Sequence, residues 1–200
     1  LHVHYAIPHA TSAYLAKQMV NKKACQVPVI TTLHGTDITL IGSDPTYKQV
    51  VDFSINQSDG VTAVSEYLKS ETYRLFDINK EIEVIPNFID LDRFKKSEKE
   101  HFKRAICPEG VKIVTRVSNF REVKRVPDVV EAFSHVLQNG VKAKLLMVGD
   151  GPDRAKAEQK CRELGMCNHV RFLGKQEKVE EILSISDLFM IPSGSETFGL

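Results

Sequence analysis

The sequence has almost no excess of either charge, no long apolar run and no leader-like start. Lysine and arginine number 27 against 26 aspartate and glutamate residues, which leaves a formal net charge of +1. That balance gives no electrostatic reason to expect nucleic acid or an anionic membrane as a partner. No apolar run approaches the roughly 20 residues needed to span a bilayer, and no basic-then-apolar signal segment opens the chain. With 42% hydrophobic and 26% charged residues, the composition predicts a soluble globular protein without a membrane partner.

A disulfide framework is also missing. Cysteine occurs at four scattered positions, Cys25, Cys107, Cys161 and Cys167. These cysteines form no C-x-x-C pair, so neither a redox motif nor a disulfide-stapled domain is expected. A reducing cytoplasm is the simplest location for such a chain. The sequence starts at Leu1 without an initiator methionine and stops at Leu200 as an apolar run begins, so we expect an internal fragment of a longer protein.

Strand-like and helix-like stretches alternate along the whole chain. Apolar or β-branched runs typical of strands occupy residues 1–5, 27–35, 60–65, 82–87, 111–118, 143–151, 169–174 and 187–193. Apolar residues recur three or four positions apart, as in helices, over residues 9–21, 46–59, 65–77, 126–139, 153–165 and 178–186. Strands separated by helices predict an α/β protein with parallel sheets covered on both faces. Ser65 provides a polar start for one helix, and Gly140 a stop for another.

A highly charged segment without strand character, residues 87–105, interrupts this alternation. Such a segment suits a connection between domains. We therefore predict one α/β unit over residues 1–88, an interdomain connection over 89–108 and a second unit over 109–200.

Ligands of open parallel sheets bind beyond the carboxyl ends of the strands, so the residues that follow each strand are candidates for a site. The segment "SNFREVKR" (118–125) places Arg121, Lys124 and Arg125 between a strand and a helix. Cationic side chains near a helix start suit phosphate oxygens, although a solvated basic turn would have the same composition. The segment "VGDGP" (148–152) lacks the third glycine of a dinucleotide fingerprint, which favours a tight turn near a ligand over a dinucleotide site.

Histidine is frequent near the start of the chain. His34 ends a strand and Gly35 follows it, so its side chain is either an acid/base or hydrogen-bonding group in a cleft or simply the end of the strand. His2 and His4 share one face of a strand, and His9 follows soon after. Neither cysteine nor carboxylate accompanies them at ligand spacing, so a metal site is not expected.

The motifs together resemble one enzyme family. The segments "HGTD", "VIPNFID-x-x-RF", "SNFR-x-VKR", "VGDGP" and "PS-x-x-E-x-FGL" occur in this order in retaining GT-B glycosyltransferases of family 4. The resemblance extends over essentially all 200 residues. It implies two Rossmann-like domains facing across a cleft, here truncated at both ends. In that arrangement residues 1–88 would belong to the acceptor-binding domain, and residues 109–200 to the donor-binding domain for a nucleotide sugar.

The stretch "LHVHYAIPHA" is more specific than the other motifs. It is similar to the branch of the family that moves N-acetylglucosamine from UDP-GlcNAc to the hydroxyl of L-malate with retention, the first step of bacillithiol biosynthesis. The resemblance implies these two small molecules as partners, and no metal or other cofactor. Cationic side chains and helix dipoles would offset the diphosphate charge. Homo-oligomerisation stays open.

The resemblance also implies roles for ten positions. The donor would be bound by Arg121, Lys124, Arg125, Gly149, Gly151 and Lys175. The catalytic groups would be His34, near the donor sugar, and Glu196, the first glutamate of the E-x7-E element. The acceptor would lie at Tyr5 and Thr36.

The chain departs from the family pattern in three respects. The glycine-rich loop would precede Leu1, the second glutamate would follow Leu200, and Asp52 stands where we expect an arginine for the malate carboxylate.

Two other functions stay open. One is transfer to another acceptor, namely a sugar, an inositol phosphate or a lipid-linked glycan. Lys17, Lys22 and Lys23 make only a weak basic helix for a lipid surface. A non-catalytic nucleotide-sugar-binding module would need neither His34 nor Glu196, and the presence of both favours an enzyme.

Overall fold

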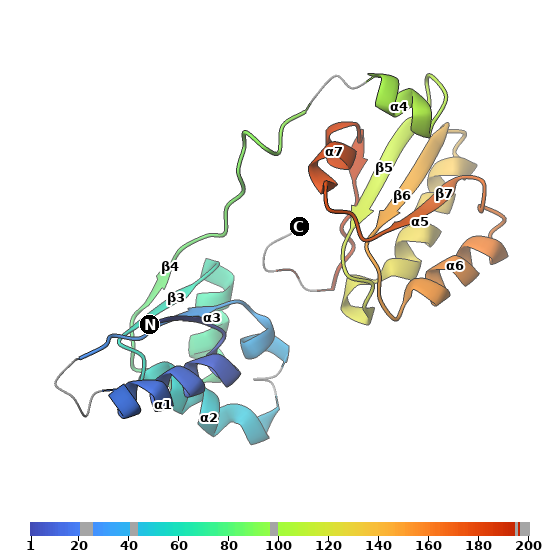
Figure 1. Cartoon of the computed structure of the whole chain (residues 1–200). Coiled ribbons are helices and arrows are strands. Elements are labelled where there is room, and N and C mark those ends of the chain that lie inside the picture. The colour runs from blue at the N-terminus through green and yellow to red at the C-terminus, as the bar shows by residue number, and fades with distance from the viewer. Residues whose placement is uncertain (21–25, 41–43, 97–99, 195, 197–200) are drawn as a thin grey trace. The chain divides into compact units, whose positions relative to one another are not determined.

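The computed structural model describes residues 1–20, 26–40, 44–96, 100–194 and 196. It divides into two compact units, Leu1–Phe88 and Ile89–Leu200 (Figure 1). Cys25, Lys22 and Lys23, considered above for a thiol and a lipid-facing helix, lie outside the described residues.

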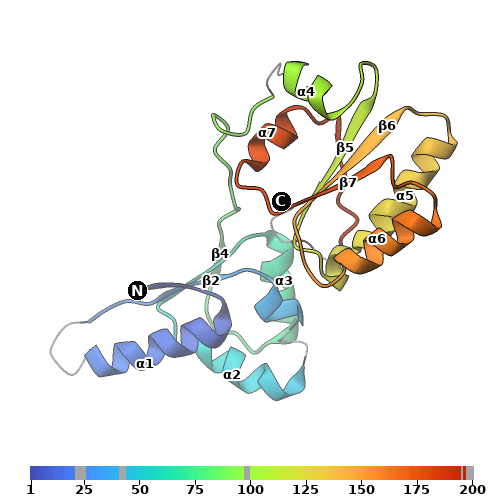
Figure 2. The ribbon, with the colours of Figure 1, turned by 45° about the vertical axis from the view of Figure 1, so that its right-hand side comes forward.

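The first unit is a parallel sheet with helices between its strands (Figures 1 and 2). Its elements are β1 (His2–His4), η1 (Ala6–Ala10), α1 (Thr11–Val20), β2 (Ile30–Leu33), η3 (Thr36–Leu40), α2 (Pro45–Asn56), β3 (Gly60–Ala63), α3 (Glu66–Leu75) and β4 (Ile82–Val84). The strand order is β1-β2-β3-β4, and the register pairs His4 with Thr32 and Thr32 with Thr62. Leu33 of β2, Ile55 of α2 and Leu68 of α3 are fully buried in its core.

Local side-chain hydrogen bonds fix where two of these helices begin. Asp44 accepts a hydrogen bond from the backbone N–H of Thr46 at 2.9 Å, and Pro45 occupies the first turn of α2, where its missing N–H costs nothing. Ser65 accepts from the backbone N–H of Leu68 at 3.1 Å at the start of α3. The polar helix start predicted at Ser65 is therefore confirmed.

The second unit is a second parallel sheet, of order β7-β6-β5-β8. Strands β5, β6 and β7 are labelled in Figure 2. Its elements are α4 (Glu100–Ile106), β5 (Lys112–Val117), η4 (Glu122–Lys124), α5 (Val126–Gln138), β6 (Ala143–Val148), α6 (Arg154–Glu163), β7 (Val170–Gly174), α7 (Val179–Ser184) and β8 (Leu188–Phe189). Gly140 has φ of +80° and its N–H donates to the Leu137 carbonyl at 2.9 Å, which confirms it as the stop of α5.

Side chains of β5 and β6 alternate between two cores. Val114 and Leu145 pack with residues of α5 and α6, whereas Ile113 and Leu146 pack with Ile182 of α7 and with side chains of α4. Helices therefore cover both faces of this sheet, as the alternation of strands and helices predicted. Within the segment expected to connect the domains, α4 contributes to the second of these cores.

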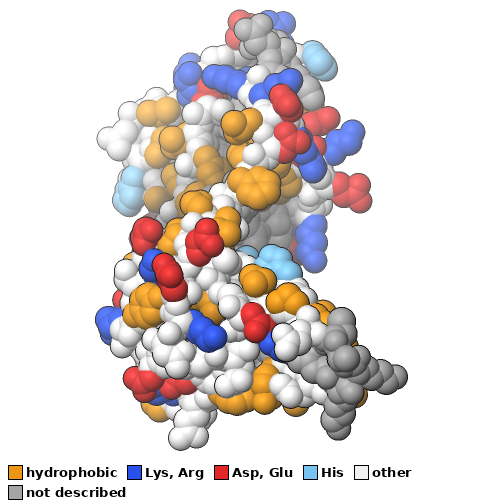
Figure 3. All heavy atoms as spheres, turned by 90° about the vertical axis from the view of Figure 1, so that its left-hand side faces the viewer, with side chains coloured by type: hydrophobic (Ala, Val, Ile, Leu, Met, Phe, Trp, Pro, Cys, Tyr) orange, Lys and Arg blue, Asp and Glu red, His pale blue; other side chains and the backbone are white. Residues whose placement is uncertain are grey.

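Basic and acidic side chains are interspersed on the face drawn in Figure 3, in keeping with the balanced composition. Among the described residues, no helix combines the length and the apolarity that crossing a membrane requires.

Candidate functional site

The strand order of the second unit reverses at β5. The next strand in sequence, β6, pairs with one edge of β5, and β8 pairs with the other edge. In open parallel sheets, ligands bind beyond the carboxyl ends of the strands at such a reversal. The segment after β5 carries Lys124, and the segment after β8 carries Glu196. Two of the predicted site residues therefore lie where the topology places a ligand.

Lys124 and Glu196 form an ion pair with 2.7 Å between Nζ and Oε1. Their side chains are 19% and 22% exposed, so the pair is partly shielded from water. Burial pushes the pKa of Glu196 upward. The pKa of Glu196 nevertheless lies below its usual value, because hydrogen bonds from Lys124 and Ser193 and the charges of Lys124 and Arg116 outweigh burial. Glu196 is therefore an ionised carboxylate at neutral pH.

Arg116, a residue that the sequence reading missed, lies beside this pair. It is on β5 and only 1% exposed. Its Nη2 donates to the Ser193 hydroxyl at 2.9 Å and to the Lys124 carbonyl at 3.4 Å, and Nη1 donates to the Met190 carbonyl at 3.4 Å. Burial lowers the pKa of Arg116, and the charge of Glu196 opposes that shift. Strand alternation from the core residue Val114 could have identified it, because residues two apart share a face.

The other predicted cations are exposed. Arg121 precedes η4, and Lys175 follows Gly174 at the end of β7. Arg125 has a left-handed backbone conformation, and its side chain pairs with Asp128 at 2.6 Å. In the part of the chain that the structure describes, no hydrogen bond or ion pair joins these three side chains to Lys124 or Glu196.

Gly149 and Gly151 lie against the segment that follows β5. Both have positive φ, +120° and +153°. A Cβ at Gly149 would overlap the Ser118 carbonyl oxygen, and a Cβ at Gly151 would come within 2.5 Å of the Phe120 carbonyl oxygen. The chain's own backbone therefore requires these glycines, whether or not a ligand approaches. The Gly149 N–H also donates to the Gly174 carbonyl at 2.8 Å, which joins the ends of β6 and β7.

In the first unit, the ends of β1 and β2 bring aromatic residues together. The ring centroids of Tyr5 and His34 are 5.0 Å apart, and those of His4 and His34 are 4.9 Å apart. His4 Nδ1 and His34 Nε2 are hydrogen-bonded at 2.7 Å. One ring must donate and the other accept, so at least one of the two is neutral. Burial, followed by the proximity of His4, lowers the pKa of His34.

Asp37, the last residue of the motif "HGTD", organises this loop, a role that the motif alone did not indicate. It is fully buried, and its carboxylate accepts from the backbone N–H groups of Ala6 at 2.7 Å, Gly35 at 3.0 Å and His34 at 3.3 Å. Burial raises the pKa of Asp37, and these hydrogen bonds oppose that shift. One side chain thus fixes the backbone after β2 relative to the backbone after β1, beside both Tyr5 and His34.

The remaining predicted positions of the first unit are solvent-facing or structural. Thr36 is exposed at the start of η3. Asp52 pairs with Lys48 at 2.7 Å within α2. Among the described residues, no group of three or more histidine, cysteine or acidic side chains is arranged to hold a metal ion.

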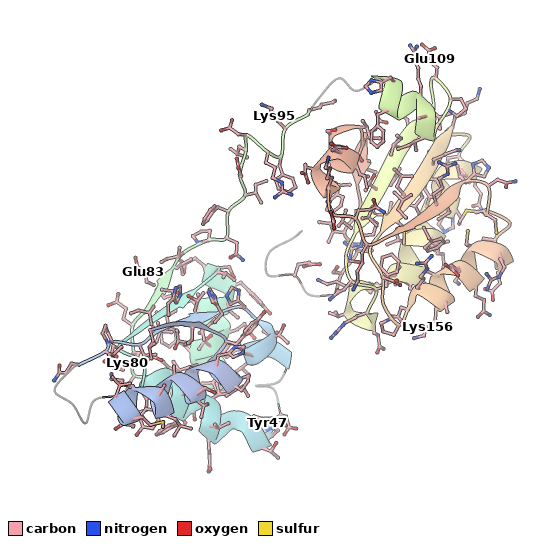
Figure 4. The ribbon with its side chains drawn as sticks, viewed as in Figure 1. Tyr47, Lys80, Glu83, Lys95, Glu109 and Lys156 are labelled. Atoms are coloured by element: carbon pink, nitrogen blue, oxygen red, sulfur yellow. The ribbon has the colours of Figure 1, made fainter. Side chains whose placement is uncertain are left out.

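A groove of about 680 Å³ lies in the same unit. Its lining residues come from η1, α1, α2 and the residue before α2: Ile7, Pro8, Thr11, Ser12, Asp44, Tyr47 and Val50. Tyr47, labelled in Figure 4, is 45% exposed. None of the predicted site residues lines this groove.

Two protein-family models match the chain. The model described as Glycosyl transferases group 1 matches residues 97–200, and the model described as Glycosyltransferase Family 4 matches residues 1–93. The chain belongs to the group 1 glycosyl transferases. The predicted resemblance to family 4 glycosyltransferases is also confirmed.

Among curated relatives of this glycosyl transferase chain, the N-acetyl-alpha-D-glucosaminyl L-malate synthase of Bacillus anthracis is 49% identical over 201 aligned residues. The alignment covers all of this chain and 52% of that protein. The chain spans about half the length of the curated relatives that it matches from end to end.

Two solved structures illustrate the fold. Anabaena Alr3699/HepE in complex with UDP and glucose gives a TM-score of 0.77 at 18% identity, covering 93% of this chain and 50% of that one. Sucrose-phosphate synthase from Thermosynechococcus elongatus gives 0.75 at 20% identity, covering 100% and 51%. At these identities the likeness concerns the fold alone, and it confirms the α/β, GT-B type of fold expected from the motifs.

Proposed function

We propose that the full-length protein is a retaining glycosyltransferase that moves N-acetylglucosamine from UDP-GlcNAc to the hydroxyl of L-malate, the first step of bacillithiol biosynthesis. The observation that carries this proposal is the 49% identity, over the whole chain, to a protein named for that product. The proposal assigns donor binding to the second unit and acceptor binding to the first.

Lys124 and Arg121 bind the diphosphate in this proposal, and Glu196 binds hydroxyls of the donor sugar. Lys124 lies just before the 13-residue helix α5, whose dipole has its positive end at this terminus and so favours an anion. Arg125, Gly149, Gly151 and Lys175 surround the nucleotide.

The reaction breaks the bond between the anomeric carbon and the UDP oxygen, whose electron pair leaves with UDP. The malate hydroxyl oxygen then bonds to the same face of that carbon, and its proton passes to the leaving phosphate. His34 contacts the donor sugar near this centre, and Tyr5 and Thr36 hold the acceptor. The protein's contribution is positioning and fixed electrostatics aimed at the developing charges.

The acceptor assay tests this proposal. The full-length protein is incubated with UDP-GlcNAc, and release of UDP is followed with L-malate, with glycerol, with inositol phosphate or without acceptor. We expect release only with L-malate, and an α-linked product by NMR. Turnover with glycerol or inositol phosphate, and none with malate, would remove the acceptor assignment and leave a glycosyltransferase for another acceptor.

A variant tests the role of His34. His34→Ala is expected to lower kcat far more than it lowers UDP affinity. His135→Ala is the matched control, because His135 is an exposed histidine on α5 that contacts Gln138. Equal losses of kcat and UDP affinity in His34→Ala would indicate a structural role instead.

A further inference from the structure

Arg116 is a buried cation for which the proposed reaction has no role. We infer that Arg116 is a positioning residue that keeps Glu196 ionised and in place when Lys124 turns from Glu196 to the diphosphate of the donor. The inference rests on the proposed function, because it takes the donor to be a nucleotide diphosphate. It goes beyond that function by giving the site a second cation that never contacts the substrate.

The position of Arg116 separates it from the ligand. With 1% of its surface exposed, its guanidinium lies beneath the segments that follow β5 and β8. It holds the first segment through the Lys124 carbonyl and the second through the Ser193 hydroxyl. Ser193 in turn hydrogen-bonds Glu196. A chain of contacts therefore runs from the central strand of the sheet to the carboxylate.

Glu196 depends on cations from two elements. Lys124 of η4 and Arg116 of β5 both favour its ionised form, and Ser193 of its own loop donates a hydrogen bond. A diphosphate that recruits the Lys124 ammonium would remove the short 2.7 Å contact. A carboxylate that is 22% exposed and left without a cation would be destabilised and would tend to bind a proton. Arg116 is only 1% exposed and offers almost no surface to a ligand, so it remains beside Glu196.

A purely structural clamp accounts poorly for Arg116. Its Nε has no hydrogen-bond partner, and two of its three hydrogen bonds are long at 3.4 Å. The Ser118 hydroxyl, two residues further along, is also buried without a partner. Replacing buried ionic groups by well-packed apolar residues of similar volume is often neutral or stabilising. The charge, rather than the packing, is what arginine supplies here.

Carbon-13 NMR of the Glu196 carboxyl in the full-length protein tests the inference. Its titration midpoint is measured in wild type and Arg116→Met, each free and saturated with UDP. In wild type the midpoint should stay at or below the ordinary glutamate value of about 4.3 when UDP is bound. In Arg116→Met with UDP, it should move upward by about one pH unit or more, because a carboxylate that loses a nearby cation binds a proton more readily.

Two further variants separate charge from packing. Arg116→Lys keeps the charge and should leave the midpoint near that of wild type. Thr115→Val is the matched control, because Thr115 is a buried neighbour of Arg116 on β5. The substitution removes the 2.6 Å hydrogen bond between the Thr115 and Ser186 hydroxyls without touching the Glu196 contacts. It should leave the midpoint unchanged.

Two outcomes overturn the inference. One is an unchanged midpoint in UDP-saturated Arg116→Met. The other, which needs no variant to fold, is a wild-type midpoint that rises above the ordinary value on UDP binding. Absence of UDP binding to the wild-type protein would instead refute the proposed function, and calorimetric titration with UDP detects that separately.

Discussion

Neutralising Glu196 should strengthen UDP binding, although Glu196 itself is proposed to contact the donor. In the free chain its carboxylate pairs with the Lys124 ammonium at 2.7 Å. UDP carries the diphosphate but not the transferred N-acetylglucosamine, so it competes for Lys124 and gains nothing from Glu196. Glu196→Gln removes this competition and also removes a negative charge close to the diphosphate.

The size of the effect follows from the exposure of the pair. Fully exposed ion pairs contribute about 0.2–1 kcal/mol, and hydrogen bonds to charged groups about 1.5–3 kcal/mol. Side chains that are 19% and 22% exposed lie between these cases, but solvent still screens them. We therefore expect Glu196→Gln to bind UDP more tightly by about 1 kcal/mol, or about fivefold in Kd.

Isothermal titration calorimetry of UDP into the full-length protein and three variants measures this. Lys124→Ala should weaken binding by about 1–3 kcal/mol. Glu180→Gln is the matched control: Glu180 pairs with Arg93 at 3.1 Å in the same unit, and UDP affinity should not change. Weaker or unchanged binding in Glu196→Gln, with the expected loss in Lys124→Ala, would refute the competition. Unchanged binding in Lys124→Ala would refute the diphosphate role itself.

Asp37→Asn should destabilise the first unit by about 2 kcal/mol in urea unfolding, because an amide cannot accept hydrogen bonds from all three backbone N–H groups. A decrease in unfolding free energy of less than about 0.5 kcal/mol would contradict this. The pKa of His34 lies below its usual 6.5, so the unfolded chain binds protons more readily near that pH and stability falls as pH drops through about 6.5. His34→Asn should make the unfolding free energy depend less on pH in this range. The same pH dependence in wild type and in His34→Asn would contradict the prediction. Gly151→Ala should lower stability in thermal unfolding by at least about 2 kcal/mol, because its Cβ meets the Phe120 backbone. Gly110 also has positive φ but lies in open space, so Gly110→Ala should cost about 1 kcal/mol. Equal losses in the two variants would contradict the prediction.

The order of secondary structure was predictable because its signals are local. The period of apolar residues distinguishes strands from helices within a few positions. Ser65 and Gly140 mark helix ends through hydrogen bonds to residues three apart in sequence. The motif "SNFREVKR" also identified the segment after β5 as a candidate site, since a strand exit is visible in the sequence.

The hydrogen-bond partners of Arg116 could not be predicted from such local signals. Its position within an apolar strand is visible, but its partners Ser193 and Met190 are 77 and 74 residues away. They become neighbours only because β8 pairs with β5 on the edge opposite β6. Alternation of strands and helices predicts a parallel sheet without stating which strand lies beside which.

By itself, then, the sequence determined most strands and helices, their order and the family to which the chain belongs, although it did not predict α4 in the expected connection. The tertiary structure alone decided which charges meet. It pairs Lys124 with Glu196 across 72 positions and His4 with His34 across 30. Secondary structure depends on hydrogen bonds and apolar periods between near neighbours, whereas electrostatic contacts depend on distance in space. Strand pairing sets that distance, and it brings the loops at the carboxyl ends together whatever their separation along the chain.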